Sequence, residues 1–170
     1  MKIFVQIASY RDPQLVSTLK DMIANAKRPK NLRFGIARQF NPEDKFDDLT
    51  EYENDKRFRI LDIPFEESKG VCWARNLTQQ VYEGEEYTMQ IDSHMRFAPN
   101  WDDEMIKMVK QLQKKGHKKP LLTGYVSSFD PENDPAGRVL ELYQLGRSQG
   151  QMMKHIQSTK ASYVLSFVVV

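Results

Sequence analysis

Cysteine is almost absent from this chain of 170 residues, and the only one, Cys72, cannot form a disulfide within the chain. Because Cys72 lies in an apolar stretch, we expect it to be a packed thiol rather than a nucleophile. No segment approaches the roughly 18 consecutive apolar residues that a membrane span requires. Residues 1–7 are too short for a signal peptide. These absences favour a cytoplasmic protein with no membrane span.

Several functional signatures are also missing. No G-x-G-x-x-G follows the first apolar segment, and neither G-x-x-x-x-G-K-[ST] nor G-x-S-x-G occurs, which disfavours a dinucleotide oxidoreductase, a P-loop kinase and a serine hydrolase. The net charge of +2 is too small to indicate nucleic acid as the main partner. An apolar content of 40% over this length is sufficient for one domain with its own core.

Hydrophobic periodicity predicts an α/β fold. Helices are expected after Asp12-Pro13, after Gly70 and after Asn100, where apolar residues recur at helical spacing. Short β-prone runs that indicate strands occupy residues 2–7, 32–37, 58–63, 87–91 and 121–126. This alternation is typical of a largely parallel sheet. Right-handed crossovers would then place residues 8–11 and 92–94 along one sheet edge, where open α/β sheets bind ligands.

The last part of the chain has a weaker pattern. Residues 139–145 fit a helix, and the apolar residues 163–170 could pair across a sheet edge.

The triplet Asp92-Ser93-His94 is the most informative motif. On extended chain an acid and an imidazole two residues apart point to the same face. An oxygen and a nitrogen ligand side by side suit Mn²⁺ or another divalent cation, and such an ion would have open positions for a diphosphate. Spacing alone, however, favours a simpler alternative in which Asp92 caps a turn and His94 packs on the surface.

Three further side chains are candidates for contacts with a nucleotide. Arg75 lies on the helix after Gly70 and could reach a phosphate with two hydrogen bonds, although an ordinary solvent-exposed arginine fits equally well. Ser9 and Arg11, at the end of the first strand, could touch a nucleotide or simply cap Asp12 and its neighbours.

Three segments in order then match one family. They are residues 4–13 (FVQIASYRDP), 70–76 (GVCWARN) and 85–97 (EEYTMQIDSHMRF). Together they resemble the UDP-GlcNAc-dependent N-acetylglucosaminyltransferases, whose best-known members glycosylate hydroxyproline on a cytosolic ubiquitin-ligase subunit. The likeness covers roughly residues 2–126.

The resemblance implies a GT-A fold, which is a Rossmann-like fold of nucleotide-diphospho-sugar transferases with a mostly parallel central sheet. It also implies retaining transfer of N-acetylglucosamine from UDP-GlcNAc to a hydroxyl acceptor on a protein or a glycan. The usual metal motif of this fold is Asp-x-Asp, and here His94 takes its third position, as in this family and in mucin-type polypeptide GalNAc-transferases.

Site roles follow from the same resemblance. Asp92 and His94 would bind the metal, and Asp92 would also lie near the ribose. Arg75 would sit near the diphosphate or donor sugar, which makes Asp92 and Arg75 the candidate catalytic residues. The substrate-binding set implied by the resemblance is Ala8, Ser9, Tyr10, Arg11, Arg75, Asp92 and Ser93.

The chain departs from the family pattern near its end, because family catalytic domains continue past residue 170 with an acceptor half and a further metal ligand. We therefore expect residues 1–127 to form the donor-binding region. Residues 128–170 would be a short atypical extension, a remnant of the acceptor half in a truncated product or a minimal variant. The alternative is a non-catalytic module that binds a nucleotide sugar or a partner. A metallohydrolase is weaker, because further ligands and a positioned base are missing.

Overall fold

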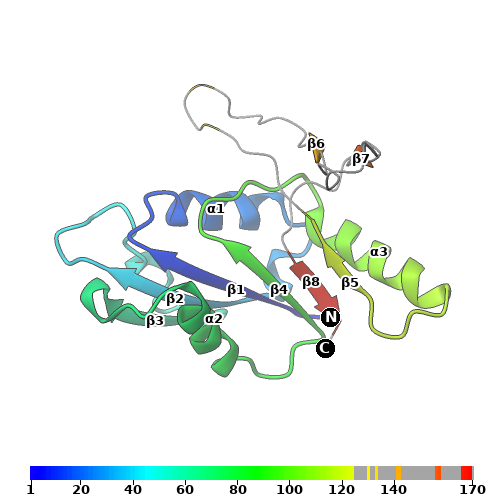
Figure 1. The fold of residues 1–170 in the computed structure, drawn as a ribbon, viewed down its shortest axis with the longest axis horizontal. Helices are drawn as coiled ribbons and strands as arrows, with labels where there is room; N and C mark the ends of the chain where they lie inside the picture. Colours follow the sequence, from blue (N-terminus) through cyan, green and yellow to red (C-terminus); the bar gives the residue numbers. More distant parts are fainter. Residues whose placement is uncertain (125–129, 131–132, 134–140, 143–155, 158–165, 170) are drawn as a thin grey trace, which may run out of the picture.

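A six-stranded sheet with the order β3-β2-β1-β4-β8-β5 forms the centre of the molecule (Figure 1). The computed structural model describes residues 1–124, 130, 133, 141–142, 156–157 and 166–169. The four parallel strands are β1 (Ile3–Tyr10), β2 (Leu32–Phe40), β3 (Phe58–Pro64) and β4 (Tyr87–Asp92). The predicted α/β fold with a mostly parallel sheet is therefore confirmed.

The remaining strands were only partly predicted. Strand β8 (Ser166–Val169) lies antiparallel between β4 and β5 (Leu121–Thr123), so the apolar tail pairs within the sheet of its own chain. Strands β6 (Glu141–Leu142) and β7 (Ile156–Gln157) pair as a separate two-stranded sheet. The helix expected over 139–145 is wrong at 141–142, because a distant partner strand pairs there, and the rest of that span lies outside the described residues.

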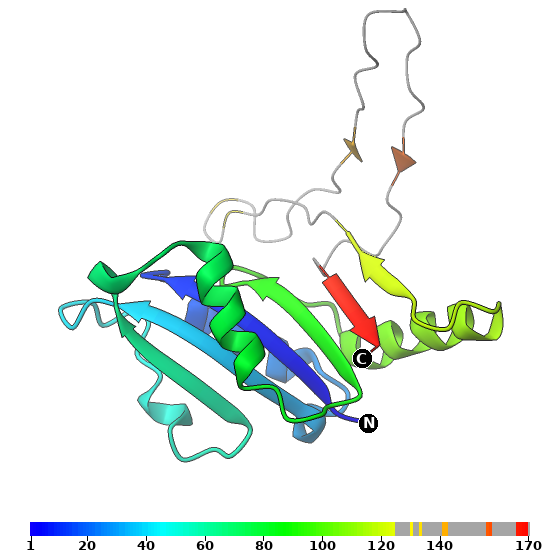
Figure 2. The ribbon, with the colours of Figure 1, turned by 60° about the horizontal axis from the view of Figure 1, so that its bottom comes forward.

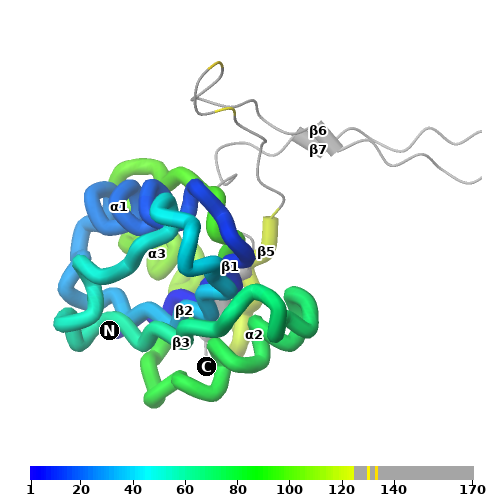
Figure 3. The backbone as a smooth tube through the Cα atoms, turned by 90° about the vertical axis from the view of Figure 1, so that its left-hand side faces the viewer, coloured from blue at the N-terminus to red at the C-terminus, as the bar shows by residue number. Residues whose placement is uncertain are grey.

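Helices cover both faces of the sheet. Helices α1 (Leu15–Asn25) and α3 (Trp101–Lys114) lie on one face and α2 (Val71–Gln80) on the other (Figures 2 and 3). Because side chains alternate along a strand, Ile3, Val5 and Ile7 of β1 join the apolar residues of α1 and α3 in one core. None of the helices in the described part of the chain is long and apolar enough to cross a membrane.

Helix α2 packs closely against the opposite face of the sheet through small side chains. Its buried residues are Ala74 and Thr78, whereas the larger apolar residues at helical spacing, Trp73, Leu77 and Val81, are only half-buried. Cys72 on its first turn is exposed, so the prediction of a packed thiol is wrong.

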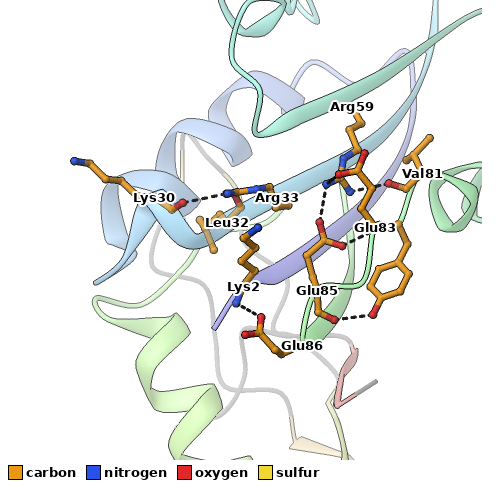
Figure 4. Close-up of polar contacts among 10 residues, drawn as sticks. Lys2, Lys30, Leu32, Arg33, Arg59, Val81, Glu83, Glu85 and Glu86 are labelled. Carbon is orange, nitrogen blue, oxygen red and sulfur yellow. Dashed lines mark hydrogen bonds and ion pairs between the residues drawn. The ribbon is translucent and has the colours of Figure 1, made fainter.

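Ion pairs join two segments at the end of the sheet where the parallel strands begin (Figure 4). Arg59 of β3 donates hydrogen bonds to the carbonyl oxygen of Val81, at 2.7 Å, and to the carboxylates of Glu83 and Glu85. Glu85 is only 3% exposed, so its ionised carboxylate is stabilised by this arginine rather than by water. These contacts attach β3 to the segment between α2 and β4, and thereby fix the start of β4.

Candidate functional site

The candidate site lies where β1 and β4 end. The two strands are parallel neighbours, and their register sets Ala8 opposite Asp92. Strand β1 continues to Tyr10, after which Arg11 adopts a positive φ of 46° and turns the chain toward α1. The expectation that residues 8–11 and 92–94 share one sheet edge is confirmed.

Asp92 is the last residue of β4 and meets Arg75 from α2. Its Oδ1 accepts a hydrogen bond from Arg75 Nη2 at 3.0 Å, and the Asp92 side chain is 39% exposed. No described residue pairs with the second oxygen, Oδ2. Within the same part of the chain, the buried Nε of Arg75 also has no hydrogen-bond partner. The fold therefore brings two of the predicted residues together and leaves polar atoms of both available.

His94 lies in a bend beyond the strand, because β4 ends at Asp92. Its Nδ1 is 2.7 Å from Oδ2 of Asp12, and 59% of its side chain is exposed. The argument that Asp92 and His94 share a face of extended chain is therefore wrong in its premise. Asp92 contacts Arg75 of α2, whereas His94 contacts Asp12, which precedes α1. Helices α2 and α1 cover opposite faces of the sheet (Figure 3).

Asp12 has three hydrogen-bond partners for its two oxygens. Oδ1 accepts from the backbone N–H of Gln14 at 2.8 Å, and Oδ2 accepts from Ser93 Oγ at 2.6 Å and lies 2.7 Å from Nδ1 of His94. Partial burial alone would raise the pKa of Asp12, but these bonds lower it to about 2. The bond to Asp12 also raises the pKa of His94 above 6.5, against the effect of burial. Sequence reasoning identified Asp12 only as a helix cap.

Helix α1 holds the turn that follows the triplet. Thr18, which is fully buried, donates through Oγ1 to the carbonyl oxygen of Ser93 at 2.7 Å and accepts from the N–H of Met95 at 2.9 Å. On the same side of the helix, Gln14 Oε1 accepts from Arg96 Nη2, and Asp21 Oδ2 accepts from the N–H of Phe97, both at 2.6 Å. The sequence analysis did not predict these contacts between α1 and residues 93–97. Gln14, Thr18 and Asp21, which are polar residues at helical spacing near the apolar positions of α1, could have indicated them.

The predicted substrate-binding segment at the end of β1, residues 8–11, is unevenly exposed. Ala8 is half-buried, Tyr10 is 54% exposed, and Ser9 is fully buried. The Ser9 hydroxyl has no partner within the described part of the chain, and its carbonyl oxygen accepts from Gln39 Nε2 at 3.0 Å. Of the first three residues in this segment, Tyr10 therefore offers the most surface to a ligand.

Arg11 is already paired. Its Nε donates to Asp44 Oδ2 at 2.7 Å, and its guanidinium lies over the ring of Phe65, 4.9 Å from the centroid. Its backbone N–H donates to the carbonyl oxygen of Gln39 at 2.9 Å, which holds the turn after β1. The side chain does not cap Asp12, contrary to one of the alternatives; it joins the end of β1 to the acidic loop after β2.

The described residues do not contain a complete metal cage. In that part of the chain, no three His, Cys, Asp or Glu side chains are grouped so that they could hold an ion. Asp92 and His94 can supply one oxygen and one nitrogen, so any ion bound there would take its other ligands from water, a bound phosphate or residues outside the described ranges.

A family model matches most of this chain. A family model described as Glycosyltransferase (GlcNAc) matches residues 2–55 and 44–143. No curated protein sequence matches the chain.

Crystal structures of TarS from S. aureus share the fold. The fragment 1–349 in complex with UDP-GlcNAc superposes with a TM-score of 0.60 at 15% identity, over 79% of this chain and 37% of that one. The same fragment with UDP gives 0.59 at 13% identity, over 79% and 38%. A longer TarS chain gives 0.57 at 12% identity, over 74% and 22%. The present chain therefore spans well under half the length of these structures.

Proposed function

The chain belongs to the glycosyltransferase (GlcNAc) family, and from this premise we propose that it transfers N-acetylglucosamine from UDP-GlcNAc to a hydroxyl acceptor. The reaction would proceed with retention and use a divalent cation, Mn²⁺, at the edge where β1 and β4 end. The observation that carries the proposal is the triplet at that edge, with Arg75 bound to its first residue. The TarS complexes with UDP-GlcNAc and UDP, which have a similar fold, support the choice of donor.

The donor atoms at the site suit Mn²⁺. Asp92 Oδ2 and His94 Nε2 are the atoms of these side chains that no described residue occupies. A carboxylate oxygen with an imidazole nitrogen is a ligand set that Mn²⁺ accepts, and diphosphate oxygens can complete the coordination. When bound, such an ion cancels negative charge on the diphosphate and stabilises UDP as a leaving group.

Arg75 supplies the second positive charge. Its Nη2 is fixed by Asp92, so the guanidinium is already oriented, and its other nitrogens can donate to a phosphate oxygen. The buried Nε has no hydrogen-bond partner in the described part of the chain, and a phosphate that reached it from the site would supply one. We assign Arg75 to the charge that builds on the departing UDP and Asp92 to the metal and the ribose.

The uridine would lie against residues 8–11. Tyr10 offers an exposed ring at the end of β1, and the backbone there is held by Gln39 and Arg11. The donor would thus bind within the region 1–127. Ser93 would contribute to donor binding through the turn that follows Asp92. The acceptor would be a protein or glycan hydroxyl, in keeping with the likeness to the hydroxyproline-type enzymes.

Calorimetric titration of UDP with and without Mn²⁺ tests the proposal. Mn²⁺ should raise the affinity for UDP, and Asp92→Asn and His94→Ala should each abolish that increase. His117→Ala is the matched control, because His117 is exposed and lies beyond the end of α3. Equal UDP affinity with and without Mn²⁺ in the wild-type protein would contradict the proposal. UDP-GlcNAc that binds but is neither hydrolysed nor transferred would favour a non-catalytic nucleotide-sugar-binding module.

A further inference from the structure

We propose that Asp12 is a positioning residue that fixes the tautomer of His94, so that the proton stays on Nδ1 and the lone pair of Nε2 faces outward. The use of that lone pair for Mn²⁺ rests on the proposed function, whereas the tautomer itself does not.

The tautomer follows from the chemistry of the pair. An ionised carboxylate can only accept hydrogen bonds, so a ring nitrogen 2.7 Å from Asp12 Oδ2 must carry the proton. A neutral imidazole has one N–H, so Nε2 is left as an acceptor. No described residue occupies Nε2. Histidines that ligate metals with one nitrogen usually donate the other N–H to a carboxylate or carbonyl, which fixes the ring and increases its basicity.

Asp12 is itself held in place. Gln14 N–H binds Oδ1 at 2.8 Å and Ser93 Oγ binds Oδ2 at 2.6 Å, so the carboxylate cannot rotate without losing hydrogen bonds. Its side chain is 15% exposed, against 59% for His94. Three contacts already involve the Asp12 carboxylate oxygens, and the described residues contain no group of three His, Cys, Asp or Glu side chains that could hold an ion with Asp12 as a member. Asp12 therefore acts on His94 rather than on the ion.

The first test uses the metal-free protein labelled with ¹⁵N-histidine, at a pH high enough for the ring to be neutral. Long-range ¹H–¹⁵N spectra report which ring nitrogen carries the proton, and His94→Asn assigns the signal. Wild-type His94 should be protonated at Nδ1. Asp12→Ala should move the proton to Nε2, the form that free histidine prefers. His117→Ala is the control, because His117 is exposed beyond the end of α3, and it should leave the His94 tautomer unchanged.

Proton on Nε2 in the wild-type protein would overturn the proposal without any variant. This measurement decides the question even if Asp12→Ala fails to fold, which circular dichroism would reveal.

The second test measures binding of Mn²⁺ alone by electron paramagnetic resonance. Loss of a residue that orients a metal-bound histidine typically weakens metal binding by about 10- to 100-fold, and we expect that loss in Asp12→Ala. His117→Ala, at an exposed histidine beyond the end of α3, should bind Mn²⁺ as well as wild type. Wild-type Mn²⁺ affinity in Asp12→Ala would overturn the role of Asp12. Wild-type protein that binds no Mn²⁺ would instead refute the proposed function, while the ring spectra still test the tautomer.

Discussion

Thr18→Val should be strongly destabilising although it hardly changes the shape of the side chain. The hydroxyl of Thr18 is the only side-chain group that contacts both the carbonyl of Ser93 and the N–H of Met95 among the hydrogen bonds of the described residues. Valine places a methyl group there and leaves one acceptor and one donor unpaired in a buried position. Helix propensity hardly differs between the two residues, so the change isolates the hydrogen bonds.

The magnitude can be estimated from these two groups. An unpaired buried polar group costs about 1–3 kcal/mol, so two cost about 2–6 kcal/mol. The added methyl group recovers about 0.8 kcal/mol through apolar burial. We therefore expect Thr18→Val to lower the free energy of unfolding by about 3 kcal/mol. For a domain of this size that corresponds to a fall in Tm of about 6–12 °C.

Thr18→Ser is the matched control. Serine keeps the hydroxyl and loses one buried methyl group, which should cost about 1 kcal/mol. The assay is urea unfolding followed by circular dichroism, together with calorimetric titration of UDP in Mn²⁺. The valine variant should be less stable than the serine variant and should bind UDP more weakly, because the turn that carries His94 is no longer fixed. Valine as stable as serine would refute the reasoning.

Two other parts of the fold give further predictions. Arg59→Ala should lower the free energy of unfolding by about 3–5 kcal/mol, because it leaves the buried carboxylate of Glu85 without its arginine. Glu83, the other partner of Arg59, has a side chain that is 71% exposed, so Glu83→Ala should lower the free energy of unfolding by less than about 1 kcal/mol. Burial raises the pKa of Glu85, but the hydrogen bonds from Arg59 and from backbone N–H groups hold this pKa below 4.5. The difference in Tm between wild type and Arg59→Ala should therefore shrink as the pH falls below 4.5 and Glu85 loses its charge. In Gly35→Ala the new Cβ would lie 2.5 Å from Phe4 Cζ, so the free energy of unfolding should fall by about 1–3 kcal/mol. Adding Phe4→Leu, which removes the clashing ring, should restore part of that stability.

The parallel core could be predicted from the sequence because its signals are local. Each of the first four strands is a short β-prone run, and each was placed correctly to within a few residues. The first strand was expected over 2–7 but extends to Tyr10. The extension depends on β2, whose Arg38 and Gln39 pair with Ser9 and Tyr10, and such pairing cannot be read from the first strand alone.

The antiparallel part could not be predicted for the same reason. Residues 166–169 form a strand because β4 and β5 offer them unpaired backbone groups. Residues 141–142 are extended because they pair with 156–157. In both cases the partner is distant in sequence. The apolar residues 163–170 were expected to pair across a sheet edge, but their pattern could not identify β4 and β5 as the partners, and the pattern over 139–145 indicated a helix.

The site shows the same division. Asp92 and Arg75 were selected from motifs, and the structure joins them by a hydrogen bond at 3.0 Å. Asp12 and Thr18 escaped notice because each also has an ordinary local role: Asp12 accepts from the N–H of Gln14 just before α1, and Thr18 is a small buried residue of the helix. Their contacts with residues 93–95 arise only when α1 folds back beside the end of β4.

The meeting of Asp12 with His94 depends on one turn. Ala8 and Asp92 are level in the sheet, so two parallel strands that simply continued would carry Asp12 beyond His94. Arg11 prevents this because its φ of 46° reverses the chain, and an L-residue enters this left-handed region at a cost of about 1–2 kcal/mol. The backbone bond to Gln39 and the ion pair with Asp44 offset that strain. The conformation of Arg11 therefore sets the distance between the two side chains, and the strain is localised where the site requires the chain to turn.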